Sequence, residues 1–146
     1  MVSISMGDCR AMKFVDTPWK DIVVQTAFYY VIKDKYPVTE GHILFVPKED
    51  THENLLKCYE AAHLWGNGYV NDGYCDGYNI GMNVGEAAGQ TIMYPHVHLI
   101  PRRKGDMEDP RGGVRHVIPE KGNYKKDDDT RPITDEVGDI IYGDGC

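Results

Sequence analysis

Two histidines separated by a single residue stand in an apolar segment of the chain. His96 and His98 lie within the stretch Tyr-Pro-His-Val-His-Leu-Ile-Pro-Arg, residues 94–102. Alternate side chains of an extended strand share a face, so the two imidazoles are expected to point the same way, about 7 Å apart. Histidine can act as a nucleophile, a general base or a metal ligand. The two side chains can therefore contact neighbouring atoms of one substrate.

The residues around this pair narrow the chemistry. Tyr94 shares the face of the two histidines in an extended strand, whereas Val97 and Leu99 point to the other face. A Gly-Gln-Thr segment at residues 89–91 precedes the strand, and small residues let backbone N–H groups approach an anion such as phosphate. The His-x-His pattern alone is also compatible with two structural histidines. A zinc pair is a third interpretation, although zinc usually takes three or four ligands.

Short segments rich in β-branched and aromatic residues predict the strands that position these histidines. They cover residues 22–24, 28–32, 43–46, 78–84 and 96–100. The connections between the first three are too short for crossover helices, which indicates an antiparallel meander.

A helix is expected between the third and fourth strands. From Thr51 to about Cys75, apolar residues recur at offsets of three and four, so one stripe can face the sheet. Thr51 is a suitable N-cap, whereas Gly66 and Gly68 disfavour the middle of the helix. We therefore predict an α+β fold with an antiparallel sheet of about five strands and one main helix.

Composition excludes several classes of protein. The 146 residues suit one ordinary domain, and 16 basic against 23 acidic residues give a net charge of −7, which disfavours nucleic-acid binding. No apolar stretch approaches the roughly 20 residues of a membrane-spanning helix. The four cysteines form no CxxC pair, and the first residues do not resemble a secretory signal. We expect a cytoplasmic protein with reduced thiols, without a cysteine zinc site.

After Arg102 the composition shifts to charged residues, glycine and proline, including the run Lys125–Asp129. We predict a catalytic domain over residues 1–106. The remaining residues, 107–146, are predicted to be a C-terminal extension that packs in extended form on the domain or on a partner subunit.

With its neighbours, the histidine segment resembles the signature of the histidine triad (HIT) family. Gly89-Gln90-Thr91 precedes the histidines and Pro101-Arg102 follows them, as in that signature. Upstream, Gly41-His42 leads into a strand that ends in Pro47-Lys48, which is similar to a second element of the family. The two motifs stand in the family's order, and the resemblance covers about residues 21–106.

The resemblance implies a nucleophile and a departure from the family pattern. His96 takes the place of the family's middle histidine, the nucleophile, and His98 takes that of the histidine that contacts the reacting phosphate. Tyr94 stands where the first histidine is expected, a departure that bears on the rate and on the leaving-group preference. Gln90, with backbone N–H groups around Thr91, is expected to stabilise phosphoryl charge. Neither a metal nor another cofactor is required.

The family pattern also implies a nucleotide-binding set. Asp34 corresponds to a position that hydrogen-bonds the ribose, Asn83 to one near the leaving group, and His42 and Leu44 to the nucleoside side of the pocket. Gly89 and Thr91 belong to the phosphate loop. From the residues alone, Asp34 could instead be solvated, Asn83 could be a strand-end amide, and His42 could be a packed turn histidine.

The sequence thus predicts an enzyme. We expect a nucleotide hydrolase or nucleotidyl transferase that cleaves at the α-phosphate of a nucleotide derivative through a nucleotidyl-His96 intermediate. Dinucleoside polyphosphates and nucleoside phosphoramidates are candidate substrates by resemblance, and a homodimer is implied in the same way. The alternative is a nucleotide-binding regulatory module in which Tyr94 and Pro95 have weakened catalysis.

Overall fold

The computed structural model describes residues 12–124. The chain divides into two compact units, Met1–Asp106 and Met107–Cys146. The predictions on the run Lys125–Asp129 and on the rest of residues 125–146 lie outside the described residues. Whether residues 107–146 pack on the domain or on a partner stays a prediction.

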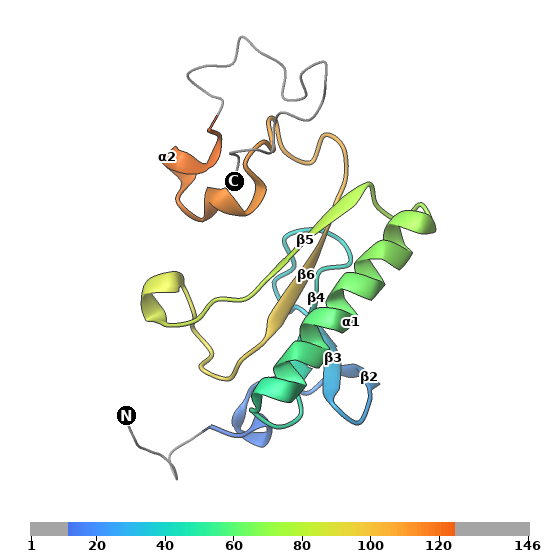
Figure 1. Cartoon of the computed structure of the whole chain (residues 1–146), viewed down its shortest axis with the longest axis vertical. Helices are drawn as coiled ribbons and strands as arrows, with labels where there is room; N and C mark the ends of the chain where they lie inside the picture. Colours follow the sequence, from blue (N-terminus) through green and yellow to red (C-terminus); the bar gives the residue numbers. More distant parts are fainter. Residues whose placement is uncertain (1–11, 125–146) are drawn as a thin grey trace. The chain divides into compact units, whose positions relative to one another are not determined.

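The first unit is built on a five-stranded antiparallel sheet (Figure 1). Its strands are β2 (Ile22–Gln25), β3 (Tyr29–Lys33), β4 (Ile43–Pro47), β5 (Gly77–Gly81) and β6 (Val97–Arg102). They lie in the order β2-β3-β4-β6-β5, so the last strand is inserted between its two predecessors. The predicted α+β class, the strand number and the initial meander are confirmed.

One long helix, α1 (His52–Asn71), packs against β3, β4, β5 and β6 (Figure 1). The Thr51 hydroxyl accepts a 3.1 Å hydrogen bond from the Asn54 N–H, which confirms the predicted N-cap. The helix continues through Gly66 and Gly68 to Asn71, within the predicted block, and the lower helix propensity of the two glycines does not end it. A Cβ at Gly66 would lie 2.7 Å from the Tyr78 ring, so this glycine allows β5 to approach the helix closely.

Apolar side chains form one cluster on each face of the sheet. The cluster beneath α1 contains Val97 and Leu99 together with Phe45 and the helix residue Cys58. The opposite cluster comprises Trp19, Ile32, Leu44, Val46 and Tyr94. The predicted alternation is therefore confirmed, and the chemistry-bearing side chains lie on the face away from α1.

The first unit also contains two short helices, η2 (Phe14–Asp16) and η3 (Glu86–Ala88). The second unit begins with the short helix η4 (Gly113–Val117). The second unit also contains α2 (Pro119–Gly122), so residues 113–122 are folded where composition predicted an extended chain. There the Asp109 carboxylate accepts hydrogen bonds from Arg111 and Asn123.

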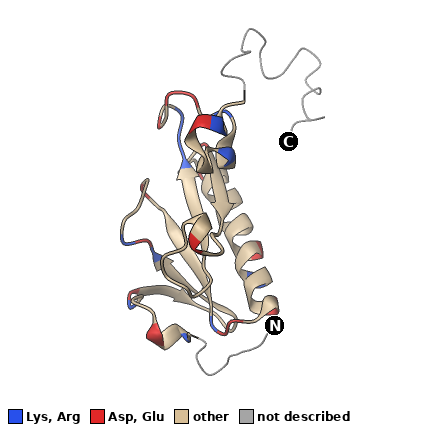
Figure 2. Ribbon diagram, turned by 90° about the vertical axis from the view of Figure 1, so that its left-hand side faces the viewer, with Lys and Arg blue, Asp and Glu red and all other residues tan. Residues whose placement is uncertain are grey.

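In Figure 2 the strands are mostly uncharged, while basic and acidic residues lie mainly in loops and on α1. No helix within residues 12–124 is long and apolar enough to cross a membrane.

Candidate active site

His96 lies immediately before β6 with its two ring nitrogens in different environments. Nδ1 is 2.7 Å from the Tyr94 carbonyl oxygen, which can only accept, so Nδ1 carries the proton. Nε2 therefore keeps its lone pair. The side chain is buried, and the Trp19 ring lies edge-on to it with 4.8 Å between ring centroids. Burial lowers the pKa of His96, which keeps the imidazole neutral at pH 7.

His98 belongs to a chain of hydrogen bonds that begins at a backbone amide. The Val38 N–H donates to His42 Nδ1 over 3.1 Å, so the proton of the neutral His42 ring lies on Nε2. That nitrogen is 2.9 Å from His98 Nδ1 and donates to it. His98 Nδ1 is thus an acceptor, and the remaining proton of His98 lies on Nε2. The contacts assign opposite tautomers to His96 and His98.

Asp34 closes this cluster on one side. Its Oδ2 lies 3.3 Å from His42 Nε2 and 3.9 Å from His98 Nδ1, while Oδ1 accepts the Tyr36 N–H over 2.8 Å. The carboxylate faces the two imidazoles and is not a solvated loop charge.

Burial keeps the two imidazoles His42 and His98 uncharged. Burial lowers the pKa of His42, against an opposing effect of Asp34. Burial, with smaller contributions from His96 and His42, lowers the pKa of His98 to about 4. Both rings are consequently neutral at pH 7, as the hydrogen-bond assignment requires.

Asp34, His42 and His98 each offer one ligand atom within 4.8 Å of the others, a spacing that a metal ion can bridge. The bond from the Val38 N–H does not fit that use, because a histidine that binds metal through Nε2 ordinarily donates from Nδ1. We therefore assign a proton to His42 Nε2, which faces both His98 Nδ1 and Asp34 Oδ2.

The strand and turn that carry His42 explain its position. Gly41 has φ +92°, and a Cβ there would lie 2.6 Å from the Tyr74 hydroxyl, so only glycine suits this turn. Leu44 is directly opposite His98 in the β4–β6 pairing and is buried in the cluster with Tyr94. His42 is itself buried, which favours the packed turn histidine over a direct nucleoside contact.

The segment between β5 and His96 folds around Gln90. Its Oε1 accepts the Gly85 N–H over 2.8 Å and its Nε2 donates to the Ile92 carbonyl over 3.0 Å. Gly89 adopts a left-handed φ of +92° at the end of η3. Gln90 thus holds the loop together, a role that the family resemblance did not indicate.

The structure does not bring all predicted residues into the histidine cluster. Asn83 follows the end of β5 and Thr91 is exposed, and neither side chain hydrogen-bonds to another residue of the described range 12–124. The sequence interpretation left out Trp19 and the Val38 amide. Only the tertiary fold places them here, since neither belongs to a recognisable motif.

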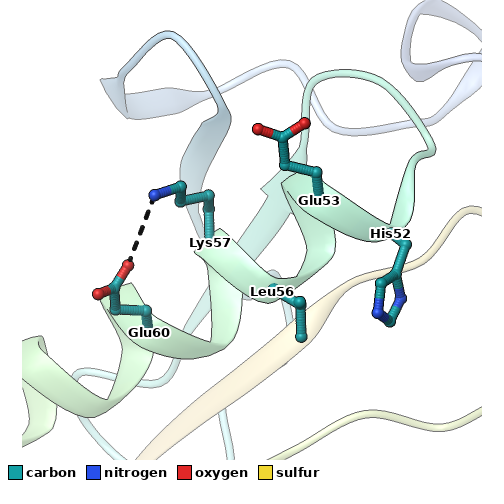
Figure 3. Close-up of a pocket in the computed structure, with 5 residues that line it drawn as sticks. All are labelled: His52, Glu53, Leu56, Lys57 and Glu60. Carbon is teal, nitrogen blue, oxygen red and sulfur yellow. Dashed lines mark ion pairs between the residues drawn. The ribbon is translucent and has the colours of Figure 1, made fainter.

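A shallow groove along α1 is separate from this cluster. It is lined by His52, Glu53, Leu56, Lys57 and Glu60, with a Lys57–Glu60 ion pair across it (Figure 3). Its residues come from one helix that covers the other face of the sheet, so we place no chemistry there.

The HIT domain family matches residues 18–105, more than half of the 146-residue chain. The chain therefore belongs to the histidine triad (HIT) family. Its fold is similar to the crystal structure of a zinc-bound histidine triad family protein from Mycobacterium smegmatis. The TM-score is 0.57 at 29% identity, covering 66% of this chain and 74% of that one.

Two characterised relatives are enzymes by name. The chain is 34% identical to adenylylsulfatase HINT3 of Arabidopsis thaliana over 82 residues, which are 51% of this chain and 42% of that protein. It is 28% identical to bis(5'-adenosyl)-triphosphatase of Dictyostelium discoideum over 102 residues, 62% of this chain and 68% of that protein. The chain thus spans less than half of the Arabidopsis relative.

Proposed function

We propose that this protein is a nucleotide hydrolase or nucleotidyl transferase that cleaves at the α-phosphate of a nucleotide derivative. The observation that carries the proposal is the pair of Nδ1 contacts, His96 with the Tyr94 carbonyl and His98 with His42 Nε2, which assign opposite tautomers to the two rings. His96 presents a lone pair at Nε2, and His98 presents an N–H at Nε2. A nucleophile and a hydrogen-bond donor on neighbouring rings are what displacement at phosphorus needs.

In the first step, His96 Nε2 attacks the α-phosphorus and the bond from phosphorus to the leaving oxygen breaks. The leaving oxygen departs with the bonding electron pair, and the His98 Nε2–H donates a hydrogen bond that stabilises the charge developing there. A covalent nucleotidyl-His96 remains, joined by a P–N bond, and its Nδ1–H still donates to the Tyr94 carbonyl.

In the second step, water attacks the same phosphorus and its proton is released to solvent. The P–N bond breaks, a nucleoside monophosphate is released, and both histidines return to their starting states. With inorganic phosphate in place of water, the same steps make the protein a transferase. The scheme uses no cofactor.

The predicted binding residues support this reaction. Asp34 retains unused lone pairs on both oxygens and can accept from the two ribose hydroxyls, while Leu44 lies opposite His98 in the β4–β6 pairing. Gly89, Gln90 and Thr91 form the loop whose backbone N–H groups would bind the phosphoryl oxygens. Asn83 is assigned to the leaving-group side and His42 to holding His98.

The substrate class follows from the named relatives and from the chemistry. The two relatives are named as an adenylylsulfatase and a bis(5'-adenosyl)-triphosphatase, and both names refer to an adenosine-containing substrate. We propose a nucleoside 5'-phosphoryl group joined to a phosphate, sulfate or amine leaving group. We propose further that Tyr94 occupies the place of the family's first histidine and that the protein is a homodimer.

Product analysis by mass spectrometry tests the reaction. Wild type, His96→Ala and the control His52→Ala, which alters an exposed histidine at the start of α1, are incubated with diadenosine triphosphate, adenylyl sulfate and an AMP phosphoramidate. We expect AMP from wild type and from the control, and a loss of about 100-fold or more in His96→Ala.

Three outcomes of that experiment are decisive. AMP release with equal rates in wild type and His96→Ala would contradict the nucleophile. Nucleotide binding with no turnover of any substrate would favour the alternative of a regulatory module. The identity of the fastest substrate would name the leaving group.

A further inference from the structure

Tyr94 occupies a buried position between two strands. Its side chain is 1% exposed, and its hydroxyl donates to the Pro47 carbonyl over 2.8 Å and lies 3.1 Å from the Lys48 carbonyl. These two carbonyls are at the end of β4, on a segment far from residue 94 in the sequence. The phenol thus connects the entry of β6 to the end of its neighbouring strand.

The backbone of the same residue orients the candidate nucleophile. The Tyr94 carbonyl accepts from His96 Nδ1 over 2.7 Å, and this bond selects the tautomer that leaves Nε2 free. Pro95 lies between them. Proline has a fixed φ and restricts the residue before it to extended conformations, so the carbonyl between Tyr94 and Pro95 has little freedom.

The side chain of Tyr94 is also held in place, by the packing of its ring. The ring packs in the cluster with Leu44 and Val46 and lies edge-on to Phe14, with 6.2 Å between centroids. Burial raises the pKa of the Tyr94 phenol to about 12, so the hydroxyl remains a donor over the whole working pH range. The donor atom is at the far end of the six-membered ring, and an imidazole at this position has no atom at that reach.

We propose that Tyr94 is a positioning residue for the nucleophile, whose phenol ties the carbonyl that orients His96 to the end of β4. The proposal rests on the proposed role of His96. It makes the tyrosine a functional replacement for the family's first histidine and not a sign of lost catalysis. The phenol itself touches no substrate.

Tyr94→Phe tests this directly because it removes one oxygen and keeps the buried ring. We expect kcat to fall about tenfold with KM unchanged, since the nucleophile is misplaced while the binding residues are intact. Long-range ¹H–¹⁵N spectra of the histidine rings are expected to show His96 as a pure Nδ1–H tautomer in wild type and as a mixture in Tyr94→Phe.

Tyr30→Phe is the matched control, because Tyr30 packs on the same cluster and stacks on Phe14. We expect its kcat and its His96 spectrum to equal those of wild type. A second variant, Tyr94→His, restores the family residue but lacks the reach to β4, so we expect its kcat to be lower than wild type, also about tenfold.

Several results would overturn the proposal. One is a Tyr94→Phe protein with the wild-type His96 tautomer, whatever its activity. Another is a Tyr94→His protein at least as active as wild type, which applies even where Tyr94→Phe does not fold. If wild type turns over no nucleotide, the proposed function fails, and the tautomer spectra still decide whether Tyr94 orients His96.

Discussion

The ring nitrogens of three neighbouring histidines have different hydrogen-bond partners. His96 donates from Nδ1 to a carbonyl, His42 accepts at Nδ1 from a backbone amide, and His98 accepts at Nδ1 from His42. In each case a main-chain group or a neighbouring ring selects the tautomer. The chemistry therefore depends on contacts that sequence spacing does not contain.

The pH dependence of turnover follows from these environments. Burial lowers the pKa of His96 below its ordinary value of 6.5, so the free lone pair persists to lower pH than in an exposed histidine. We expect kcat/KM for AMP release to be constant between about pH 7 and 8 and to fall at lower pH with a midpoint below about 6.5, as His96 becomes protonated.

A pH–rate profile with the preferred substrate measures this. An acid limb with its midpoint above pH 6.5 would show that His96 is not buried as described. Repeating the profile with Tyr30→Phe checks that a variant of the same cluster leaves the midpoint in place.

At the scale of the elements, the pairing of β6 with β4 creates the site. Leu44 lies opposite His98 in this pairing, which brings the turn that carries His42 next to the histidine strand. The same pairing places the end of β4 within reach of the Tyr94 hydroxyl. Helix α1 supports the sheet from the other face and contributes no side chain to the histidine cluster.

Two glycines of α1 allow a test of how closely β5 packs against the helix. A Cβ at Gly66 would lie 2.7 Å from the Tyr78 ring, whereas a Cβ at Gly68 would meet nothing within 4 Å. Gly66→Ala should reduce the free energy of unfolding by about 1–3 kcal/mol through overpacking. Gly68→Ala should raise it by up to about 1 kcal/mol through helix propensity.

Urea unfolding followed by circular dichroism gives both values. Equal stability of the two variants would contradict the close approach of β5 to α1 at Gly66.

At the scale of the whole molecule, the sheet has β5 at one edge, paired only with β6 among the described strands. Large apolar side chains of α1 remain exposed, with Leu56 at 54% and Leu64 at 59%. An open strand edge and exposed apolar side chains are features that a second copy can cover. These features support the proposed homodimer.

Light scattering coupled to size-exclusion chromatography checks the assembly. We expect a mass twice the 16.5 kDa of the chain. Leu64→Glu, at an exposed position of α1, is expected to shift the protein toward the single-chain mass. Leu56→Glu, nearer the start of the helix, is measured for comparison. A wild-type protein that runs at the single-chain mass at micromolar concentration would exclude the homodimer.

The sequence alone determined the local features of this protein. Alternating residues at 94–100 predicted which side chains share a face, Thr51 predicted the start of the helix, and β-branched segments predicted five strands. Such features depend on residues close together in the chain, and simple periodicity or turn chemistry is enough to find them. The family signature added the order of the motifs and the identity of the candidate nucleophile.

Only the tertiary structure decided how the histidines are held. The contact between His42 and His98 joins residues 56 apart in sequence, and Tyr94 reaches a carbonyl 47 residues away. No local pattern encodes such pairs, because they exist only once β6 has entered the sheet beside β4. Tautomers and lowered pKa values follow from these partners and from burial, which are properties of the packed fold and not of residue type.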